Sequence, residues 1–305
     1  MESIIINPDN YQEKYINYLN QCFNNWGGTR EYEWVFNRVV GDKTSDIIII
    51  KDENNKTIAG SGITYRKIGS QNGDVIDIAI MTGSWTLPQA RKRGIFSKII
   101  QISREISNSK SVAYLTAFVT ESNASFRRLK DAGSFLLPSY YSFSPEKLYD
   151  QPNNLSVSPI NGDGEVVSNI YNKLRASEKD FVHFNYSLVE FSHQYIKRPG
   201  NVELIIIGND YALIEETKEL IKVHLITFEN VHTLEDNIKA LSNWVLENRS
   251  KKIFLFSTRK EIAEIYHNLA FENTSGYFTI LDTSNSAISD KDHFTKLDVN
   301  MGDKM

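Results

Sequence analysis

The sequence predicts an α/β (α+β) protein with two similar halves, each a mixed, mostly antiparallel β-sheet flanked by helices. Short runs rich in isoleucine and valine alternate with amphipathic helical patterns along the chain. The first of these runs follow one another across short turns, which is typical of antiparallel strands. The order of elements before residue 150 returns after residue 168, at a distance of roughly 140 residues, as in a structural repeat.

In the first half, the clearest helix has isoleucines at 95, 99, 102 and 106, which form one apolar stripe. The clearest buried strand is almost continuously apolar. A short helix begins at Ser122 or Asn123, which can cap it, and ends at Gly133. In chain order we expect a strand at 3–8, helices at 10–26 and 30–40, strands at 45–53, 57–68 and 74–87, a helix at 95–107, a strand at 111–119, a helix at 122–133 and a strand at 134–145.

The second half follows a segment rich in Pro, Asn, Gly and Asp, which is typical of a linker. We therefore divide the chain into a first domain at 1–150, a linker at 151–168 and a second domain at 169–305. The tail from Asn285 is polar, and we expect it to be loosely packed. The expected elements are helices at 166–177, 233–249 and 260–270, and strands at 202–208, 211–217, 221–228, 252–258 and 275–281.

The composition limits the possible functions. The formal charge of −4 argues against a general nucleic-acid binder, so any positive site must be local. The single cysteine, Cys22, rules out a disulfide framework and suits a small buried side chain in a reducing cytoplasm. No spacing of His, Asp or Glu indicates a metal site. We also see no signal peptide or membrane-length apolar run, and we expect a cytoplasmic protein without membrane partners.

The segment "TLPQARKRGIF" at 86–96 contains the most informative pattern. A strand ends at Pro88, a long helix begins near Ile95, and the connection contains three basic residues and Gly94. Free N–H groups at a helix start attract anions, and glycine allows a phosphate to approach the backbone closely. Cations alone would be unfavourable there because they oppose the helix dipole. The equivalent junction of the second half, "LITFENVHTLEDN", has neither the glycine nor the basic cluster.

"RKRGIF" resembles the (Arg/Gln)-x-x-Gly-x-(Gly/Ala) element of GNAT-superfamily acyltransferases, and "NASFRRLKDAGSF" is similar to the family's next motif. Phe96 departs from the final Gly/Ala, and Lys130 stands where many members have the tyrosine that protonates the leaving thiolate. The resemblance implies acyl-coenzyme A as co-substrate and direct transfer to an amine, with no metal. It implies cofactor contacts from Trp85, Thr86, Leu87, Arg91, Lys92, Arg93, Gly94, Ile95, Phe96, Ser97 and Asn123.

The catalytic residues are suggested by fewer observations than the cofactor residues. No glutamate occupies the family's usual base position, near Ile80, so Asp77 is the suggested base and Thr82 and Ser84 are nearby alternatives. Tyr140 or Tyr141 is the suggested proton donor to the thiolate. Asn123 is equally well explained as a plain helix cap.

The tandem layout resembles two-domain bacterial nucleotide-sugar N-acyltransferases. It implies a small-molecule amine acceptor, with a dTDP- or UDP-linked amino-deoxy sugar for surface polysaccharide (lipopolysaccharide O-antigen) as the best guess. Alternatives are a protein lysine, a peptide or an aminoglycoside, or an inactive module that only binds CoA. The suggested acceptor residues suit stacking and diphosphate binding, although a domain interface explains them equally well. They are His183, Tyr186, His193, Tyr195 and Arg198.

Overall fold

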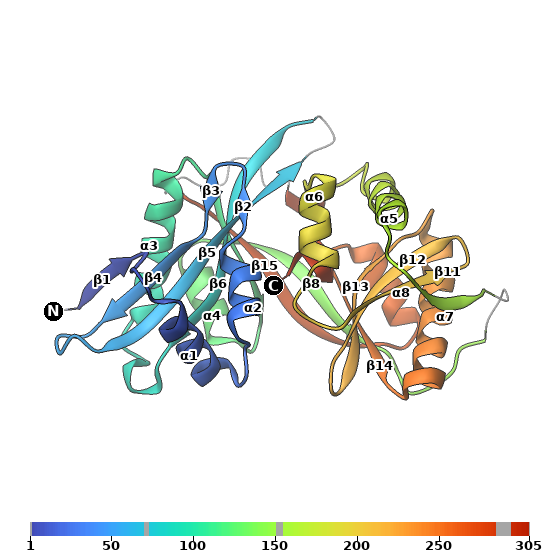
Figure 1. Cartoon of the computed structure of the whole chain (residues 1–305), viewed down its shortest axis with the longest axis horizontal. Helices are drawn as coiled ribbons and strands as arrows, with labels where there is room; N and C mark the ends of the chain where they lie inside the picture. The colour runs from blue at the N-terminus through green and yellow to red at the C-terminus, as the bar shows by residue number, and fades with distance from the viewer. Residues whose placement is uncertain (1, 70–72, 151–154, 285–293, 305) are drawn as a thin grey trace.

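A computed structural model describes residues 2–69, 73–150, 155–284 and 294–304, and its two halves lie side by side around a continuous sheet (Figure 1). The first half contains β1 (Ser3–Ile6), α1 (Gln12–Phe23), α2 (Thr29–Phe36), β2 (Val39–Val40), β3 (Lys43–Thr44), β4 (Asp46–Lys51), β5 (Thr57–Gly69), β6 (Val75–Thr86), η1 (Pro88–Ala90), α3 (Ile95–Ser109), β7 (Tyr114–Thr120), α4 (Ala124–Asp131) and β8 (Phe135–Phe143).

The second half repeats this order from β11 to β15. It contains β9 (Val157–Ile160), α5 (Gly164–Ser177), β10 (Val182–Phe184), α6 (Leu188–Phe191), a π-helical turn η2 (Ser192–Ile196), β11 (Val202–Ile207), β12 (Asp210–Glu216), β13 (Leu220–Ile226), α7 (Val231–Arg249), β14 (Lys252–Ser257), α8 (Lys260–Asn268), β15 (Glu272–Asp282), β16 (Leu297–Asp298) and η3 (Met301–Asp303).

The last strand of each half is inserted into the sheet of the other half. The strand order is β1-β4-β5-β6-β7-β15-β8-β14-β13-β12-β11-β9, so β15 from the second half separates β7 from β8. The strand β15 pairs with β7 from Gly276 to Asp282, and β8 pairs in turn with β14. The predicted mixed, mostly antiparallel sheet is confirmed, but this exchange crosses the boundary that we drew between two domains.

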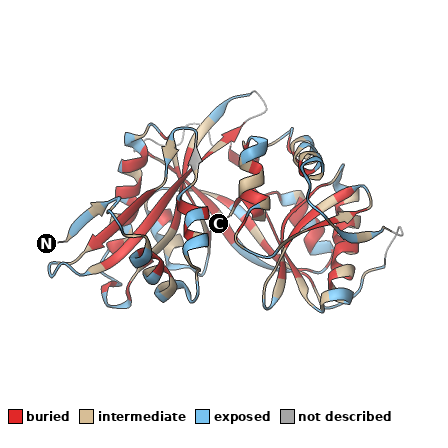
Figure 2. Cartoon of the chain, in the orientation of Figure 1, coloured by how far each residue is buried: buried red, intermediate tan, exposed pale blue. Residues whose placement is uncertain are grey.

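The core follows from the apolar patterns of the elements. The isoleucine stripe of α3 is buried against one face of β4–β7, as its spacing predicts. Helices α1 and α2 cover the opposite face with an aromatic cluster that includes Tyr15, Trp34, Phe36 and Trp85. Figure 2 shows that burial is concentrated in the strands, while the outer faces of the helices are exposed.

Two expectations about loose segments need correction. The predicted linker contains β9, which pairs with β11 at the edge of the sheet, and the start of α5. Pro159 fits there because an edge strand need not donate every N–H. In the tail, residues 294–304 are packed, with Phe294 and Val299 at 1% exposure or less, because apolar residues recur among its polar ones. Within the described ranges, no helix is long and apolar enough to cross a membrane.

Candidate active site

The connection between β6 and α3 forms an open helix start. Gly94 is the N-cap of α3 at φ 76°, and it has no side chain to occupy the free N–H groups of the first turn. Lys92 also has a positive φ, of 65°. A Cβ on Gly94 would meet nothing within 4 Å, so the space in front of the helix is open. The first turn of α3 carries no acidic residue, which leaves the helix dipole available to an anion.

Strands β6 and β7 pair only briefly and then separate. Their parallel pairing covers Ile78–Ile80 against Tyr114–Thr116, after which β7 pairs only with β15 on its other side. A register shift between Gly60 and Gly62 marks a bulge where β6 passes Gly83, which has φ 56°. Main-chain groups in the last part of β6 that face β7 therefore have no strand partner.

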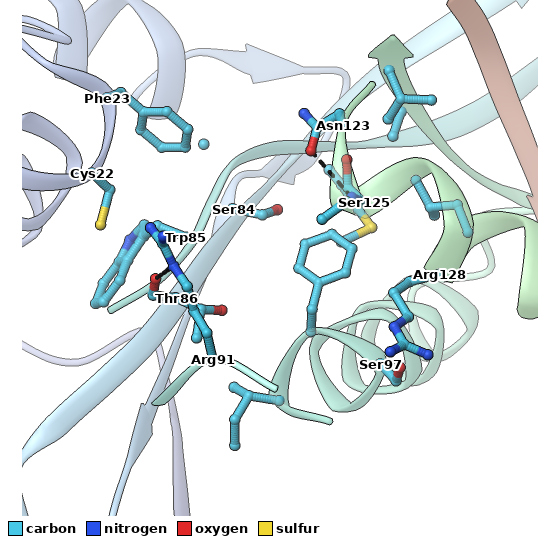
Figure 3. A pocket seen from close by; sticks show the side chains of 18 of the residues that line it. Cys22, Phe23, Ser84, Trp85, Thr86, Arg91, Ser97, Asn123, Ser125 and Arg128 are labelled. Carbon is cyan, nitrogen blue, oxygen red and sulfur yellow. Dashed lines mark hydrogen bonds between the residues drawn. The ribbon is translucent and has the colours of Figure 1, made fainter. Parts of the chain in front are cut away.

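A cavity of about 760 Å3 fills the space between the separated strands (Figure 3). Its basic end lies at the start of α3, where Arg91 and Lys92 line it together with Arg128 of α4. Its other end reaches the end of α1. The lining includes nine of the predicted cofactor residues, namely Trp85, Thr86, Arg91, Lys92, Gly94, Ile95, Phe96, Ser97 and Asn123.

Two predicted cofactor residues do not line the cavity. Leu87 is buried in the α1–α2 aromatic cluster, and its N–H donates to the Ile58 carbonyl at 2.9 Å. Arg93 points elsewhere and forms an ion pair of 3.5 Å with Glu2. The three consecutive basic residues therefore play different parts, because successive side chains of a loop point in different directions.

Several lining residues have defined local partners. Arg91 Nε donates to the carbonyl of Thr86 at 3.3 Å, which folds the side chain back along β6. The Trp85 ring stacks on Tyr18 at 4.7 Å. Asn123 is the N-cap of α4 and accepts from Ser125 N at 3.1 Å, so the plain capping role is present whether or not it contacts a ligand.

The sequence interpretation missed the lining residues that come from α1 and α4. Cys22, Phe23 and Trp26 form an apolar wall, and burial raises the pKa of the Cys22 thiol. Arg128 and Ser125 extend the polar end. Only the helical spacing of α1 hinted that Cys22 would face inward, and no motif marks the others.

Asp77, Tyr140 and Tyr141 lie away from this cavity, whereas Ser84, an alternative to Asp77, lines it. Asp77 is on β6 before the strands separate, and Lys43 Nζ holds its carboxylate at 2.7 Å. The other two candidates are on β8, which the strand exchange places next to β14. The hydroxyl of Tyr141 accepts from Lys304 Nζ at 2.8 Å, and burial raises its pKa to about 12. Tyr140 is half-buried on the same strand, opposite Ser257.

The suggested acceptor residues hold the C-terminal segment. Tyr186 and Tyr195 donate to Asp303 Oδ1 at 3.1 and 2.8 Å, and Arg198 donates to the carbonyls of Gly302 and Lys304 at 2.9 and 3.2 Å. Burial raises the pKa of Asp303 to about 6. These contacts match the interface alternative for this aromatic segment.

The two histidines of the set are also occupied. His193 stacks on Trp34, and its carbonyl accepts from Trp34 Nε1 at 2.9 Å. His183 lies on β10, and its Nδ1 is 3.2 Å from the Phe181 carbonyl. Burial lowers the pKa of His183 to about 4. In the part of the chain that the structure covers, no three His, Cys, Asp or Glu side chains come together as a metal site.

Solved structures with the same architecture cover nearly the whole chain. A tandem GNAT protein from the clavulanic acid biosynthesis pathway aligns with 94% of this chain and 100% of its own, at 11% identity and a TM-score of 0.64. The chain has the tandem GNAT fold. A GCN5-related N-acetyltransferase from Anabaena variabilis aligns with 92% of this chain and 72% of its own, at 12% identity and a TM-score of 0.65.

N-myristoyltransferase from Saccharomyces cerevisiae, solved with bound myristoyl-CoA, shares the tandem GNAT fold over 92% of this chain and 80% of its own. Its identity is 10% and its TM-score 0.66. No protein-family profile and no curated protein matches the sequence. At these identities the similarity concerns the fold.

The helix start that is open in the first half is capped at the equivalent place in the second half. In the second half, α7 follows β13 as α3 follows β6, but the Asn230 side chain caps it by accepting from His232 N and Thr233 N at 3.0 and 3.1 Å. The cavity beside β13 and β14 is only about 30 Å3. In the second half, side chains of the chain itself therefore occupy both the helix start and the space between the strands. Both are open in the first half.

Proposed function

We propose that the protein is an acyl-CoA-dependent N-acyltransferase with one donor site, in its first half. The observation that supports this most is the cavity between the separated strands β6 and β7, which ends at the uncapped start of α3. An elongated thioester with a phosphorylated end matches both the shape and the charge distribution. The tandem GNAT fold also favours this reaction class.

The donor would be bound along the cavity. Its phosphates would face the N–H groups at the start of α3, with Arg91 and Lys92 contributing charge. Its pantetheine would extend inward between the strands and use main-chain groups of Trp85 and Thr86. The thioester would then lie near Met81 and Phe118, where the strands converge. An unpaired main-chain N–H of β6 at this level would stabilise the oxyanion.

The amine acceptor completes the reaction. The amine attacks the thioester carbonyl, the C–S bond breaks, and CoA leaves as a thiol that must gain a proton. Our specific proposal for the acceptor is a dTDP- or UDP-linked amino-deoxy sugar, which rests on the resemblance to two-domain sugar N-acyltransferases. A cytoplasmic location is part of the proposal, since a chain with one cysteine suits a reducing compartment.

Thiol release tests the reaction. Acetyl-CoA and longer acyl-CoAs are offered with nucleotide-linked amino sugars, peptides, lysine-bearing proteins and aminoglycosides, and free CoA is measured with the single protein thiol subtracted. Amine-dependent release is expected. Intact CoA binding without release over the whole panel would favour an inactive CoA-binding module.

Calorimetric titration with CoA tests the donor site. Charge reversal by Arg91→Glu with Lys92→Glu should weaken CoA binding by about 100-fold, because two charge-assisted contacts are replaced by repulsion. Arg93→Glu is the matched control, since Arg93 interacts with Glu2 outside the cavity. Equal losses from both changes would contradict the assignment.

A further inference from the structure

Arg38 and Arg66 of the first half and Arg198 of the second are gathered around two shared neighbours, Trp34 and Gln194. The guanidinium carbons of Arg38 and Arg198 lie 4.8 and 4.7 Å from the ring centre of Trp34. The side-chain oxygen of Gln194 accepts from Arg38 and, at 3.5 Å, from Arg66. Arg66 is 1% exposed and Arg198 8%, while Arg38 is the half-buried member at the edge of the group.

Arg38 is the member with unused hydrogen-bonding capacity. Its Nε and Nη2 are buried and have no hydrogen-bond partner among the described residues. Arg198, in contrast, donates to the main-chain carbonyls of the C-terminal segment. Burial and the neighbouring guanidinium groups lower the pKa of Arg38 well below its usual range, which shows how strongly this environment disfavours another positive charge.

Two arginines elsewhere in the chain have carboxylate partners, whereas Arg198, like Arg38, has none at ion-pair distance among the described residues. Arg175 forms an ion pair with Glu178, and Arg259 pairs with Asp298 at 3.4 Å and with Glu261 at 2.8 Å. Within the described ranges, no carboxylate lies within ion-pair distance of Arg38. Buried charges are normally paired because removing them from water is costly. Arg38 therefore calls for an anion that the chain itself does not supply.

The position of this group relates it to the donor cavity. Strands β6 and β7 separate after Ile80, which pairs with Thr64 on β5. Arg66 is two residues further along β5, on the same face as Thr64, so the two positions are about 7 Å apart along the strand. Arg38 and Arg66 do not themselves line the cavity. We expect an acceptor whose amine lies where the strands converge to direct its other end toward them.

We infer that Arg38, together with Arg66, binds an oxyanion of the acceptor, a carboxylate or a phosphate. This inference rests on the proposed acyl transfer and narrows its acceptors to amines that also carry a negative group. Gln194 positions both guanidinium groups, and the Trp34 ring supports that of Arg38. The planar fork of an arginine suits both kinds of oxyanion, and Arg38 has two nitrogens, Nε and Nη2, without a partner among the described residues.

Anion-dependent stability tests the inference. The melting temperature of the CoA-saturated protein is measured with sodium phosphate, sodium acetate and sodium chloride at equal ionic strength. Phosphate or acetate should raise it above the chloride value in the wild type and not in Arg38→Gln, and the two salts distinguish phosphate from carboxylate. Arg127→Gln removes an exposed arginine of α4 and should behave as the wild type.

The Arg91→Glu, Lys92→Glu background separates this inference from the proposed function, because its donor site no longer attracts phosphate. Stabilisation should persist in that background and disappear when Arg38→Gln is added, whether or not the protein transfers acyl groups. Arg38→Lys, which keeps the charge but loses the fork, should retain only part of the effect. If neither salt exceeds chloride in the wild type, or if Arg38→Gln responds fully, the inference is overturned.

With an acceptor from the thiol-release panel, the KM for the anionic form should be at least about tenfold lower than for its neutral amide or dephosphorylated form. Arg38→Gln should abolish this difference and leave the affinity for CoA unchanged. Equal KM values for both forms in the wild type would also overturn the inference.

Discussion

Lys304 donates a hydrogen bond of 2.8 Å to the hydroxyl of Tyr141, deep between the two halves of the protein. The ammonium group also lies 4.1 Å from the centre of the Tyr141 ring and 5.3 Å from that of Phe118, which lines the cavity. Among the described residues no carboxylate lies within 4 Å of it. Burial, with a contribution from Lys222, lowers the pKa of Lys304 to about 7.

This lysine should make stability depend on pH. Between the folded pKa of about 7 and the usual lysine pKa of 10.5, the unfolded chain binds more protons than the folded one. Stability therefore rises with pH through that window, by at most about 1.4 kcal/mol per pH unit from this group. Urea denaturation at several values from pH 6 to pH 10 measures it. In Lys304→Met the slope should flatten; an unchanged slope would show that Lys304 is charged throughout.

Substitution of Gly94 should affect CoA binding as well as the stability of the fold. Gly94→Ala places a Cβ at φ 76°, where L-residues are strained, and should cost about 1 kcal/mol of stability. CoA should also bind more weakly, because the N–H groups at the start of α3 shift. Gly133→Ala is the matched control, since Gly133 has φ 88° and open space but lies after α4. Equal effects of both changes on CoA affinity would contradict this role.

The cap of the second half should contribute stability alone. Asn230→Ala removes the side chain that satisfies two N–H groups of α7, and it should destabilise the protein by about 1 kcal/mol. Asn230→Asp keeps the acceptor oxygen and should restore most of the loss. CoA affinity should not change in either variant; an effect on CoA binding would mean that the second half has a donor site of its own.

The rate at which the Cys22 thiol is alkylated should report whether a ligand occupies the cavity. It is the only cysteine of the chain and lines the cavity at the end of α1. Saturating CoA should slow alkylation of Cys22 by iodoacetamide about tenfold or more, because the ligand would cover the thiol that must ionise to react. In Arg91→Glu with Lys92→Glu, the same CoA concentration should protect much less. Full reactivity in the wild type with bound CoA would place the ligand elsewhere.

The donor side of the site could be predicted from the sequence because it is local. The order strand, basic loop, Gly94, helix fixes an open helix start within a dozen residues, and nine of the eleven predicted cofactor residues line the cavity. The contrast with the second half was also visible, and Asn230 now gives its physical reason. Leu87 and Arg93 were misjudged because pattern alone does not give the direction of a loop side chain.

The proposed acceptor side of the site depends on contacts between residues far apart in sequence. Arg38 follows the end of α2, and Arg66 lies on β5. Gln194, which bridges them, is more than 100 residues away in sequence. Tyr141 lies away from the cavity because β15 enters the sheet between β7 and β8. Neither local periodicity nor motif spacing carries that information. The aromatic segment at 180–200 was recognised as special, but its partner, the packed C-terminal segment, was expected to be loose.

The exchange of β8 and β15 also has a consequence for synthesis on the ribosome. When β7 emerges, its pairing edge must wait for a strand that begins at Glu272, more than 150 residues later. Until then, the nascent chain exposes an apolar strand edge that other unfinished chains can join. Completion of the cavity is thus coupled to the synthesis of β15, so a chain terminated before β15 should emerge as an aggregation-prone fragment.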